Sequence, residues 1–298
     1  MAIVQPKTRL APTPSGFLHL GNAFNFILTA LVAYHEGATT LLRIDDQDQA
    51  RYRSHFADDI FRTLHLLKIE PQQGPQSTTE LEKSWSQQLR LPLYHRALQS
   101  LRQNNQLFAC NCSRRQVEAA STDGGYSGTC QNLGLSMEAE STAWRIHTNK
   151  ETLHIAKWPL GVGATDIPAA LRHFVVRKKD GLPAYQLTSV ADDLHFGINL
   201  VVRGADLYPS TIAQLYLARQ LRAQGFENIR WLHHPLLTAE DGLKISKSTE
   251  RGARQLSQIY LASEIYRHFC QWLKLPEVES LAELKELNFH EKIARFSD

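Results

Sequence analysis

The chain lacks any hydrophobic run of membrane-spanning length, which is roughly 20 residues for a helix. Its first residues, Met1 to Pro6, contain neither a positively charged start nor an apolar segment, so they do not form a secretory signal. Internal repeats and low-complexity tracts are also missing from the sequence. We therefore expect a cytoplasmic protein with no membrane partner.

A strong charge of one sign is missing as well. The formal net charge is only +3, so overall electrostatics alone does not indicate a nucleic-acid-binding protein. Short basic runs at 114–115 and 177–179 could contact phosphates, but solvent-exposed surface explains them equally well. With 298 residues, 43% of them hydrophobic, the chain can bury a large core and form two domains.

Cysteine is rare, and three of the four cysteines are clustered. Cys110 and Cys112 are separated by one residue, and Cys130 follows with Tyr126 four positions before it. In a reducing compartment this pattern favours a metal site or free thiols over disulfides. Three thiolates could hold zinc if Tyr126, a water or a distant histidine completes the tetrahedron. The alternative is three reduced, buried cysteines. We expect Cys270, far from the cluster, to be a core residue.

Apolar residues alternate between strand-like runs and helical spacing along most of the chain. Strands are predicted at 7–11, 41–44, 199–204 and 229–232, and helices at 21–36, 56–67, 93–101 and 212–221. This alternation predicts an α/β fold with a parallel sheet and right-handed crossovers. The pattern becomes irregular between 108 and 190, with a strand predicted at 142–146. We therefore predict a nucleotide-binding domain in two halves, 1–107 and 191–240. An inserted domain at 108–190 separates the halves, and a loop-and-helix segment follows at 241–298.

The motif His19-Leu20-Gly21-Asn22 lies where a predicted strand turns into a predicted helix. A helix that opens there offers unpaired N–H groups and a positive dipole end, which suit a phosphate. His19 could donate a hydrogen bond to triphosphate oxygens, and Gly21 would let an adenosine approach the backbone. An ordinary strand–helix turn with a surface histidine is the alternative.

A second motif, Lys244-Ile245-Ser246-Lys247-Ser248, follows the turn signal Asp241-Gly242. A loop with two lysines and two serines could close over ATP and balance the charge of a leaving pyrophosphate. We assign that contact to Lys247. A solvated lysine loop is the alternative, and the presence of the first motif argues against it.

Together the two motifs resemble the HIGH and KMSKS signatures of class I aminoacyl-tRNA synthetases. The glutamyl branch of that class resembles this chain at 9–22, 42–48, 185–187 and 202–207, so the resemblance covers nearly the whole sequence. Fewer residues follow Ser248 than a helical anticodon-binding region needs, which fits the truncated glutamyl-queuosine tRNA(Asp) synthetases. The resemblance implies a class I synthetase Rossmann-like nucleotide-binding fold, an inserted zinc-containing domain and a short helical C-terminal segment.

The resemblance also implies a zinc ligand set. The family carries a structural zinc on a Cys-x-Cys…Tyr-x-x-x-Cys pattern, and this sequence matches it at Cys110, Cys112, Tyr126 and Cys130. The match favours Tyr126 as the fourth ligand over the water or the histidine.

A glutamate pocket is implied in the same way. Arg9 would pair with the side-chain carboxylate, which suits a bidentate guanidinium, and Arg203 would add positive charge. Asp45 would hold the ammonium where the family usually has glutamate, with a reach shorter by roughly 1.5 Å. The remaining residues assigned to the pocket are Leu10, Ala11, Pro12 and Thr13, which line it, and Tyr185, which hydrogen-bonds the substrate. Structural pairing at the sheet edge is the alternative for Arg9, Arg203 and Asp45.

The activity implied by the resemblance is ATP-dependent formation of glutamyl-adenylate from L-glutamate, followed by transfer to queuosine at the wobble position of tRNA(Asp). His19, Lys244 and Lys247 would stabilise the reacting phosphates, Gly21 and Asn22 would help to bind ATP, and Mg²⁺ would accompany it. We expect a monomer. The alternatives are a minimal glutamyl-tRNA synthetase that charges the 3′ end, an amide-forming ligase on the same scaffold, and a catalytically inactive RNA-binding module.

Overall fold

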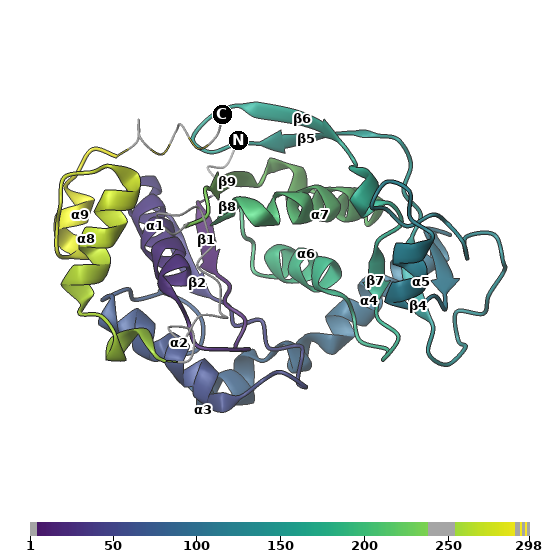
Figure 1. Cartoon of the computed structure of the whole chain (residues 1–298), viewed down its shortest axis with the longest axis horizontal. Helices are drawn as coiled ribbons and strands as arrows, with labels where there is room; N and C mark the ends of the chain where they lie inside the picture. The colour runs from purple at the N-terminus through teal and green to yellow at the C-terminus, as the bar shows by residue number, and fades with distance from the viewer. Residues whose placement is uncertain (1–4, 238–253, 290–292, 294–295, 297–298) are drawn as a thin grey trace. The chain divides into compact units, whose positions relative to one another are not determined.

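A computed structural model describes residues 5–237 and 254–289, together with Ile293 and Phe296. The helices in this part of the chain are all too short or too polar to span a bilayer. Two compact units divide the chain (Figure 1) and are described one after the other. The first contains Met1–Arg90, Ile198–Asp206 and Arg230–Asp298, and the second contains Leu91–Gly197 and Leu207–Ile229.

Parallel strand pairs form the centre of the first unit. Strand β1 (Lys7–Leu10) pairs in parallel with β2 (Thr39–Leu42), and β8 (Leu200–Gly204) pairs in parallel with β9 (Arg230–His234). Strands β1 and β8 are neighbours, because the amide of Asn199 donates to the carbonyl of Lys7 at 3.0 Å and its side-chain oxygen accepts from the Lys7 amide at 2.8 Å. The predicted parallel pairing is therefore confirmed.

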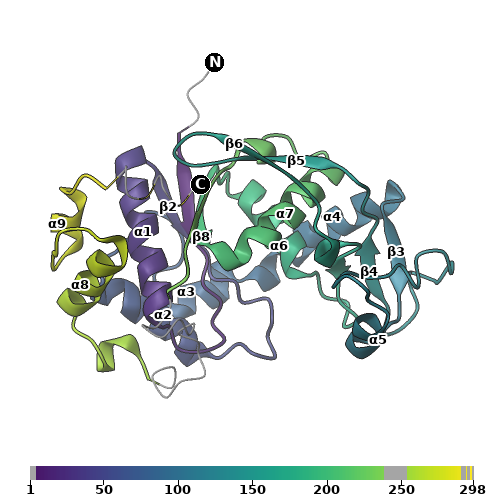
Figure 2. The ribbon, with the colours of Figure 1, turned by 45° about the horizontal axis from the view of Figure 1, so that its top comes forward.

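Helix α1 (Leu20–Glu36) provides most of the apolar surface that covers these strands. Its inward face is a nearly continuous set of buried residues that contains Phe24, Ile27, Leu28, Leu31 and Val32. Helices α8 (Ala262–Leu273) and α9 (Leu281–Lys285) lie against α1, as Figures 1 and 2 both show. The Phe24 and Phe269 rings meet edge to face with centroids 5.5 Å apart. The predicted helical C-terminal segment is thus confirmed for α8 and α9.

Strand β2 ends earlier than the sequence predicts, at Leu42 instead of Ile44. Pro12 lies opposite this end and has no N–H, so it cannot donate the next ladder hydrogen bond. The segment after β2 nevertheless stays beside the segment after β1, because Arg43 N donates to Leu10 O and Asp45 N to Pro12 O, at 2.8 and 2.9 Å. Proline therefore ends the ladder without releasing Asp45 from the sheet edge. Helices α2 (Ser54–Leu66) and α3 (Thr78–Glu80) complete the described α-helices of this unit.

The second unit contains a three-stranded antiparallel sheet and a separate hairpin. The sheet has the order β3 (Leu107–Cys110), β4 (Ala143–Ile146) and β7 (Val175–Arg177), and the hairpin pairs β5 (Thr152–Ala156) with β6 (Val162–Asp166). The strand predicted at 142–146 is confirmed as β4. Strand β6 escaped prediction because its exposure alternates without any buried residue, so it has no apolar face to recognise.

Four helices belong to the second unit: α4 (Leu91–Gln103), α5 (Arg114–Ala119), α6 (Tyr185–His195) and α7 (Tyr208–Gln220). The hydroxyl of Tyr94 in α4 donates to the buried carboxylate of Asp192 in α6 at 2.8 Å. Helix α5 follows strand β3 directly and is labelled beside β3 and β4 in Figure 2.

Candidate functional site

His19 is the residue that caps the N-terminus of α1. Its backbone is extended, with φ −121° and ψ 172°, and its Nδ1 accepts a hydrogen bond from the amide of Gly21 at 3.1 Å. The His19 amide in turn donates to Oδ1 of Asn22 at 3.1 Å. Because Nδ1 is an acceptor here, the proton of the neutral imidazole is on Nε2. The motif therefore presents an Nε2–H donor at a helix N-terminus, where an oxyanion is favoured.

Gly21 leaves the space that the His19 ring occupies. A Cβ added at Gly21 would lie 3.0 Å from Cε1 and 3.1 Å from Nδ1 of His19, closer than an ordinary carbon contact. Sequence analysis assigns Gly21 a different role, the close approach of an adenosine to the backbone. In the structure this glycine also keeps the imidazole in the orientation that caps the helix.

Arg9 and Arg203 lie on neighbouring strands, β1 and β8, and are 4% and 3% exposed. The guanidinium of Arg203 lies 4.5 Å from the centroid of the Trp231 ring, a cation–π contact. Charged groups are costly to bury without polar or anionic partners. The structure therefore brings the two predicted carboxylate-binding arginines onto adjacent strands in the interior of the first unit.

Asp45 is already engaged by a cation of the chain itself. Arg43 Nε lies 2.7 Å from Asp45 Oδ1, and Arg43 Nη2 lies 3.1 Å from Oδ2, which makes a buried bidentate pair. This is the structural pairing that the sequence left open for Asp45. A substrate ammonium would have to share the carboxylate with Arg43, so the assignment of Asp45 to the ammonium stays a prediction.

Asp46, which the sequence did not single out, is held by two hydrogen bonds. Its carboxylate accepts hydrogen bonds from Ser86 Oγ at 2.6 Å and from the Gln87 amide at 2.7 Å. Burial raises the pKa of Asp46, while these hydrogen bonds act in the opposite direction. Asp46 therefore fixes the loop that carries Asp45.

The other predicted residues differ in their surroundings. Leu10 and Pro12 are buried, Ala11 is half-buried and Thr13 is exposed. Tyr185 is the first residue of α6, is 41% exposed and belongs to the second unit. Lys244 and Lys247 lie outside the described residues.

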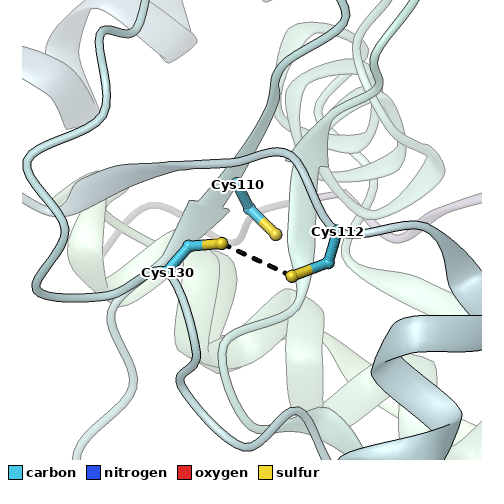
Figure 3. A group of neighbouring side chains, drawn as sticks. All are labelled: Cys110, Cys112 and Cys130. Carbon is cyan, nitrogen blue, oxygen red and sulfur yellow. Dashed lines mark hydrogen bonds between the residues drawn. The ribbon is translucent and has the colours of Figure 1, made fainter.

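Cys110, Cys112 and Cys130 form a compact group at the end of β3 (Figure 3). Their sulfur atoms all lie within 4.8 Å of one another, with Cys112 Sγ and Cys130 Sγ 3.4 Å apart. The hydroxyl of Tyr126 lies 3.4 Å from Cys110 Sγ and 3.8 Å from Cys112 Sγ, and it accepts from the Cys130 amide at 2.9 Å. The four side chains predicted as zinc ligands are therefore neighbours in the structure.

The spacing of these atoms fits a tetrahedral zinc site. Zn–S bonds of about 2.3 Å and a Zn–O bond of about 2.0 Å place ligand oxygen and sulfur about 3.5 Å apart, and two sulfurs about 3.8 Å apart. The distances from Cys112 Sγ to Cys130 Sγ and from the Tyr126 hydroxyl to Cys110 Sγ and Cys112 Sγ differ from these by a few tenths of an ångström, and the remaining S···S distances are at most 4.8 Å. Among the described residues no histidine joins the group of candidate metal-ligand atoms. Tyr126 therefore supplies the nearest fourth atom.

The ionisation of the cluster is uneven. Burial raises the pKa of Cys110, but the hydrogen bond with Tyr126 and the positive charge of Arg145 outweigh burial and bring the pKa to about 7. Burial and the hydrogen bond with Cys130 raise the pKa of Cys112 to about 11. Burial also raises the pKa of Tyr126. Of Cys110 and Cys112, Cys110 therefore has the lower pKa, and a bound cation would favour the anionic forms of the ligands.

His234, which sequence reasoning missed, contacts the helix that carries the first motif. It is the last residue of β9, and its Nε2 lies 3.1 Å from Asn25 Oδ1, while its Nδ1 lies 2.9 Å from Pro235 O. Burial lowers the pKa of this imidazole. A histidine at the end of an apolar strand gives no functional signal in one sequence, so only the structure reveals the contact.

Comparison with known proteins gives a consistent family. The model described as tRNA synthetases class I (E and Q), catalytic domain, matches residues 5–269. Glutamyl-Q tRNA(Asp) synthetase of Dechloromonas aromatica is 37% identical over 268 residues, which are 88% of this chain and 84% of that protein. The enzyme of the same name from Ralstonia nicotianae is 34% identical over 288 residues, 92% of this chain and 87% of that protein.

A solved structure shares the fold. The glutamate-tRNA synthetase of Elizabethkingia anophelis superposes with a TM-score of 0.78 at 19% identity, over 98% of this chain and 70% of that chain. The sequence match over most of the chain and the shared fold agree. The chain therefore belongs to the class I tRNA synthetases of the glutamate and glutamine type and, within them, to the glutamyl-Q tRNA(Asp) synthetase family.

Proposed function

We propose that this protein activates L-glutamate with ATP to form glutamyl-adenylate and then transfers the glutamyl group to queuosine at the wobble position of tRNA(Asp). The proposal includes a monomeric protein in the cytoplasm. The observation that carries it is the similarity, over 88% of the chain, to a relative named for this RNA and this amino acid. The capping geometry of His19 supports the nucleotide chemistry.

The first step needs positioning and charge balance and no nucleophile from the protein. A carboxylate oxygen of glutamate attacks the α-phosphorus of ATP, and pyrophosphate leaves from the opposite side. The Nε2–H of His19 and the N-terminus of α1, with Gly21 and Asn22, would contact phosphate oxygens. Lys244 and Lys247 would balance the charge of the leaving pyrophosphate. Mg²⁺ accompanies ATP as its counterion.

The buried charges of the first unit support the proposed assignment of residues that bind glutamate. Arg9 would pair with the side-chain carboxylate of glutamate, and Arg203 would add positive charge, while Leu10 to Thr13 line the pocket and Tyr185 hydrogen-bonds the substrate. Asp45 would accept the ammonium. A carboxylate offers about four lone-pair positions, so Asp45 can hold its two hydrogen bonds from Arg43 and still accept from a substrate.

Cys110, Cys112, Tyr126 and Cys130 would hold one zinc ion. With four protein ligands such a site has no open position, so the ion would be structural, adding stability to the segment around β3 and α5. The support for this proposal is the match between the measured S···S and S···O distances and a tetrahedral site.

Transfer of labelled glutamate to tRNA(Asp) tests the proposal most directly. The assay compares tRNA(Asp) that contains queuosine with the same tRNA from cells unable to make the modified base. After nuclease digestion, the label should be found on the queuosine nucleoside and not on the 3′-terminal adenosine. Equal transfer to both RNAs, with label on the terminal adenosine, would favour a minimal glutamyl-tRNA synthetase. Absence of glutamate-dependent pyrophosphate exchange would favour the inactive RNA-binding module.

A further inference from the structure

Arg145 belongs to no recognised motif, yet it stacks on Tyr126, one of the four proposed zinc ligands. It lies on β4, opposite Phe108 of β3, and its guanidinium carbon is 3.9 Å from the centroid of the Tyr126 ring. Its Nη1 donates to the carbonyl of His173 at 2.8 Å, which fixes the guanidinium over the ring.

The loaded cluster needs a cation of this kind. Three thiolates and one phenolate around Zn²⁺ carry a net charge of about −2. Cys110, Cys130 and Tyr126 are 1%, 2% and 3% exposed, so water compensates little of that charge. Uncompensated buried charge is strongly unfavourable. The single positive charge of a guanidinium stacked on the Tyr126 ring would compensate about half of the excess.

Arg145 also holds the ring of Tyr126 in place. A cation over the face of an aromatic ring is attracted to its π electrons, and this attraction grows when the phenol oxygen carries negative charge.

A second cation, Lys179, lies at the exposed edge of the cysteine cluster, where its Nζ donates to the carbonyl of Asn111 at 2.7 Å. Asn111 lies between the two cysteines of the Cys-x-Cys turn. The inner cation is thus Arg145 and the outer one is Lys179.

We propose that Arg145 is a positioning residue of the metal site, which holds the Tyr126 ring from its face and compensates the excess negative charge of the zinc-loaded cluster. The inference rests on the zinc site proposed above and adds a residue outside the four ligands. Partners outside the ligand set commonly change metal affinity by roughly 10- to 100-fold. We expect Arg145 to contribute on that scale.

Zinc affinity of the purified full-length protein, measured by competition with a chromophoric chelator, tests the role of Arg145. Arg145→Met should weaken zinc binding by roughly 10- to 100-fold, and Arg145→Lys should keep part of the lost affinity because it retains the charge. Arg177→Met is the matched control. Arg177 also stacks on an aromatic ring, Trp144, at 4.7 Å, and donates to a backbone carbonyl at 3.1 Å, but its contacts lie elsewhere. The zinc affinity of the Arg177→Met variant should equal that of the wild type.

A spectroscopic readout separates positioning from a general loss of stability. With Co²⁺ in place of zinc, thiolate and phenolate ligands give charge-transfer and ligand-field bands, and Tyr126→Phe defines the spectrum without the phenolate. Arg145→Met should shift the cobalt spectrum toward that of Tyr126→Phe. Wild-type affinity and an unchanged cobalt spectrum in Arg145→Met would overturn the inference, as would equal losses in the Met and Lys variants. A wild-type protein without bound zinc would overturn the zinc proposal itself, while glutamate transfer is scored separately.

Discussion

Replacing Gly21 with alanine should damage the chemistry while leaving the fold nearly as stable. The new Cβ would lie 3.0 and 3.1 Å from two atoms of the His19 ring, whereas ordinary contacts begin near 3.4 Å. The imidazole must therefore move by several tenths of an ångström or rotate. Rotation would break the 3.1 Å hydrogen bond from the Gly21 amide to Nδ1, which fixes the position of the ring proton.

The effect on stability is the sum of small opposing contributions. A side chain pushed about 30° from its rotamer costs about 0.5–1.5 kcal/mol, and a lost N-cap hydrogen bond costs about 1 kcal/mol. Replacing glycine with alanine inside a helix stabilises the folded state by about 1 kcal/mol. The free energy of unfolding should therefore fall by only about 1 kcal/mol. The rate of adenylate formation should fall far more, by roughly 10²-fold, which is typical for the loss of one preorganised donor.

Glutamate-dependent pyrophosphate exchange and urea unfolding together measure both effects. Gly37→Ala is the matched control, because Gly37 ends the same helix with φ 61° and a Cβ there would contact nothing within 4 Å. That variant should lose about 1–2 kcal/mol to its left-handed backbone and keep the wild-type exchange rate. If Gly21→Ala exchanges pyrophosphate as fast as the wild type, the proposed role of the His19 ring is wrong.

Three further predictions concern the pocket, the metal and pH. Arg9→Leu should abolish glutamate activation, and glutamine should be a poor substrate of the wild type because it cannot pair with a buried guanidinium; equal exchange with both amino acids would contradict the pocket. Metal analysis should find about one zinc per chain in the wild type and a clear loss in Cys112→Ser, whereas a zinc-free wild type with full stability would refute the site. Burial lowers the pKa of His234 in the folded state, so the unfolded chain binds the extra proton first, and the free energy of unfolding should fall as pH drops below about 6.5, by up to about 1.4 kcal/mol per pH unit. Urea unfolding between neutral and mildly acidic pH should show a smaller slope in His234→Gln, and identical slopes in the two proteins would rule out this contribution.

The parallel strands and α1 could be predicted because burial imposes a spacing that one sequence displays. Lys7 to Leu10 form a short apolar-ended strand, and the apolar residues of α1 recur at helical intervals. The cysteine cluster was visible for a different reason. The spacing of Cys110, Cys112 and Cys130 indicated a metal site or free thiols, and the family resemblance added Tyr126 as the fourth ligand.

The pair between Arg43 and Asp45 could not be predicted from spacing. The two residues are two positions apart, and in a regular strand such neighbours share a face without forming a bidentate pair. Their contact depends on the local backbone after Leu42, where the regular strand ends, and sequence spacing does not reveal that backbone. Arg145 was hidden for a similar reason, because a strand arginine is ordinary until the ring beneath it is known.

The hydrogen bond from Gly21 to His19 makes one backbone amide a reporter of readiness for catalysis. When the first turn of α1 frays, the Gly21 amide exchanges with solvent and the imidazole loses the contact that fixes its proton on Nε2. The hydrogen-exchange protection factor of this amide therefore reports the fraction of molecules in which the His19 imidazole is oriented to donate to a phosphate. The first helical turn and the orientation of the His19 Nε2–H donor therefore form together.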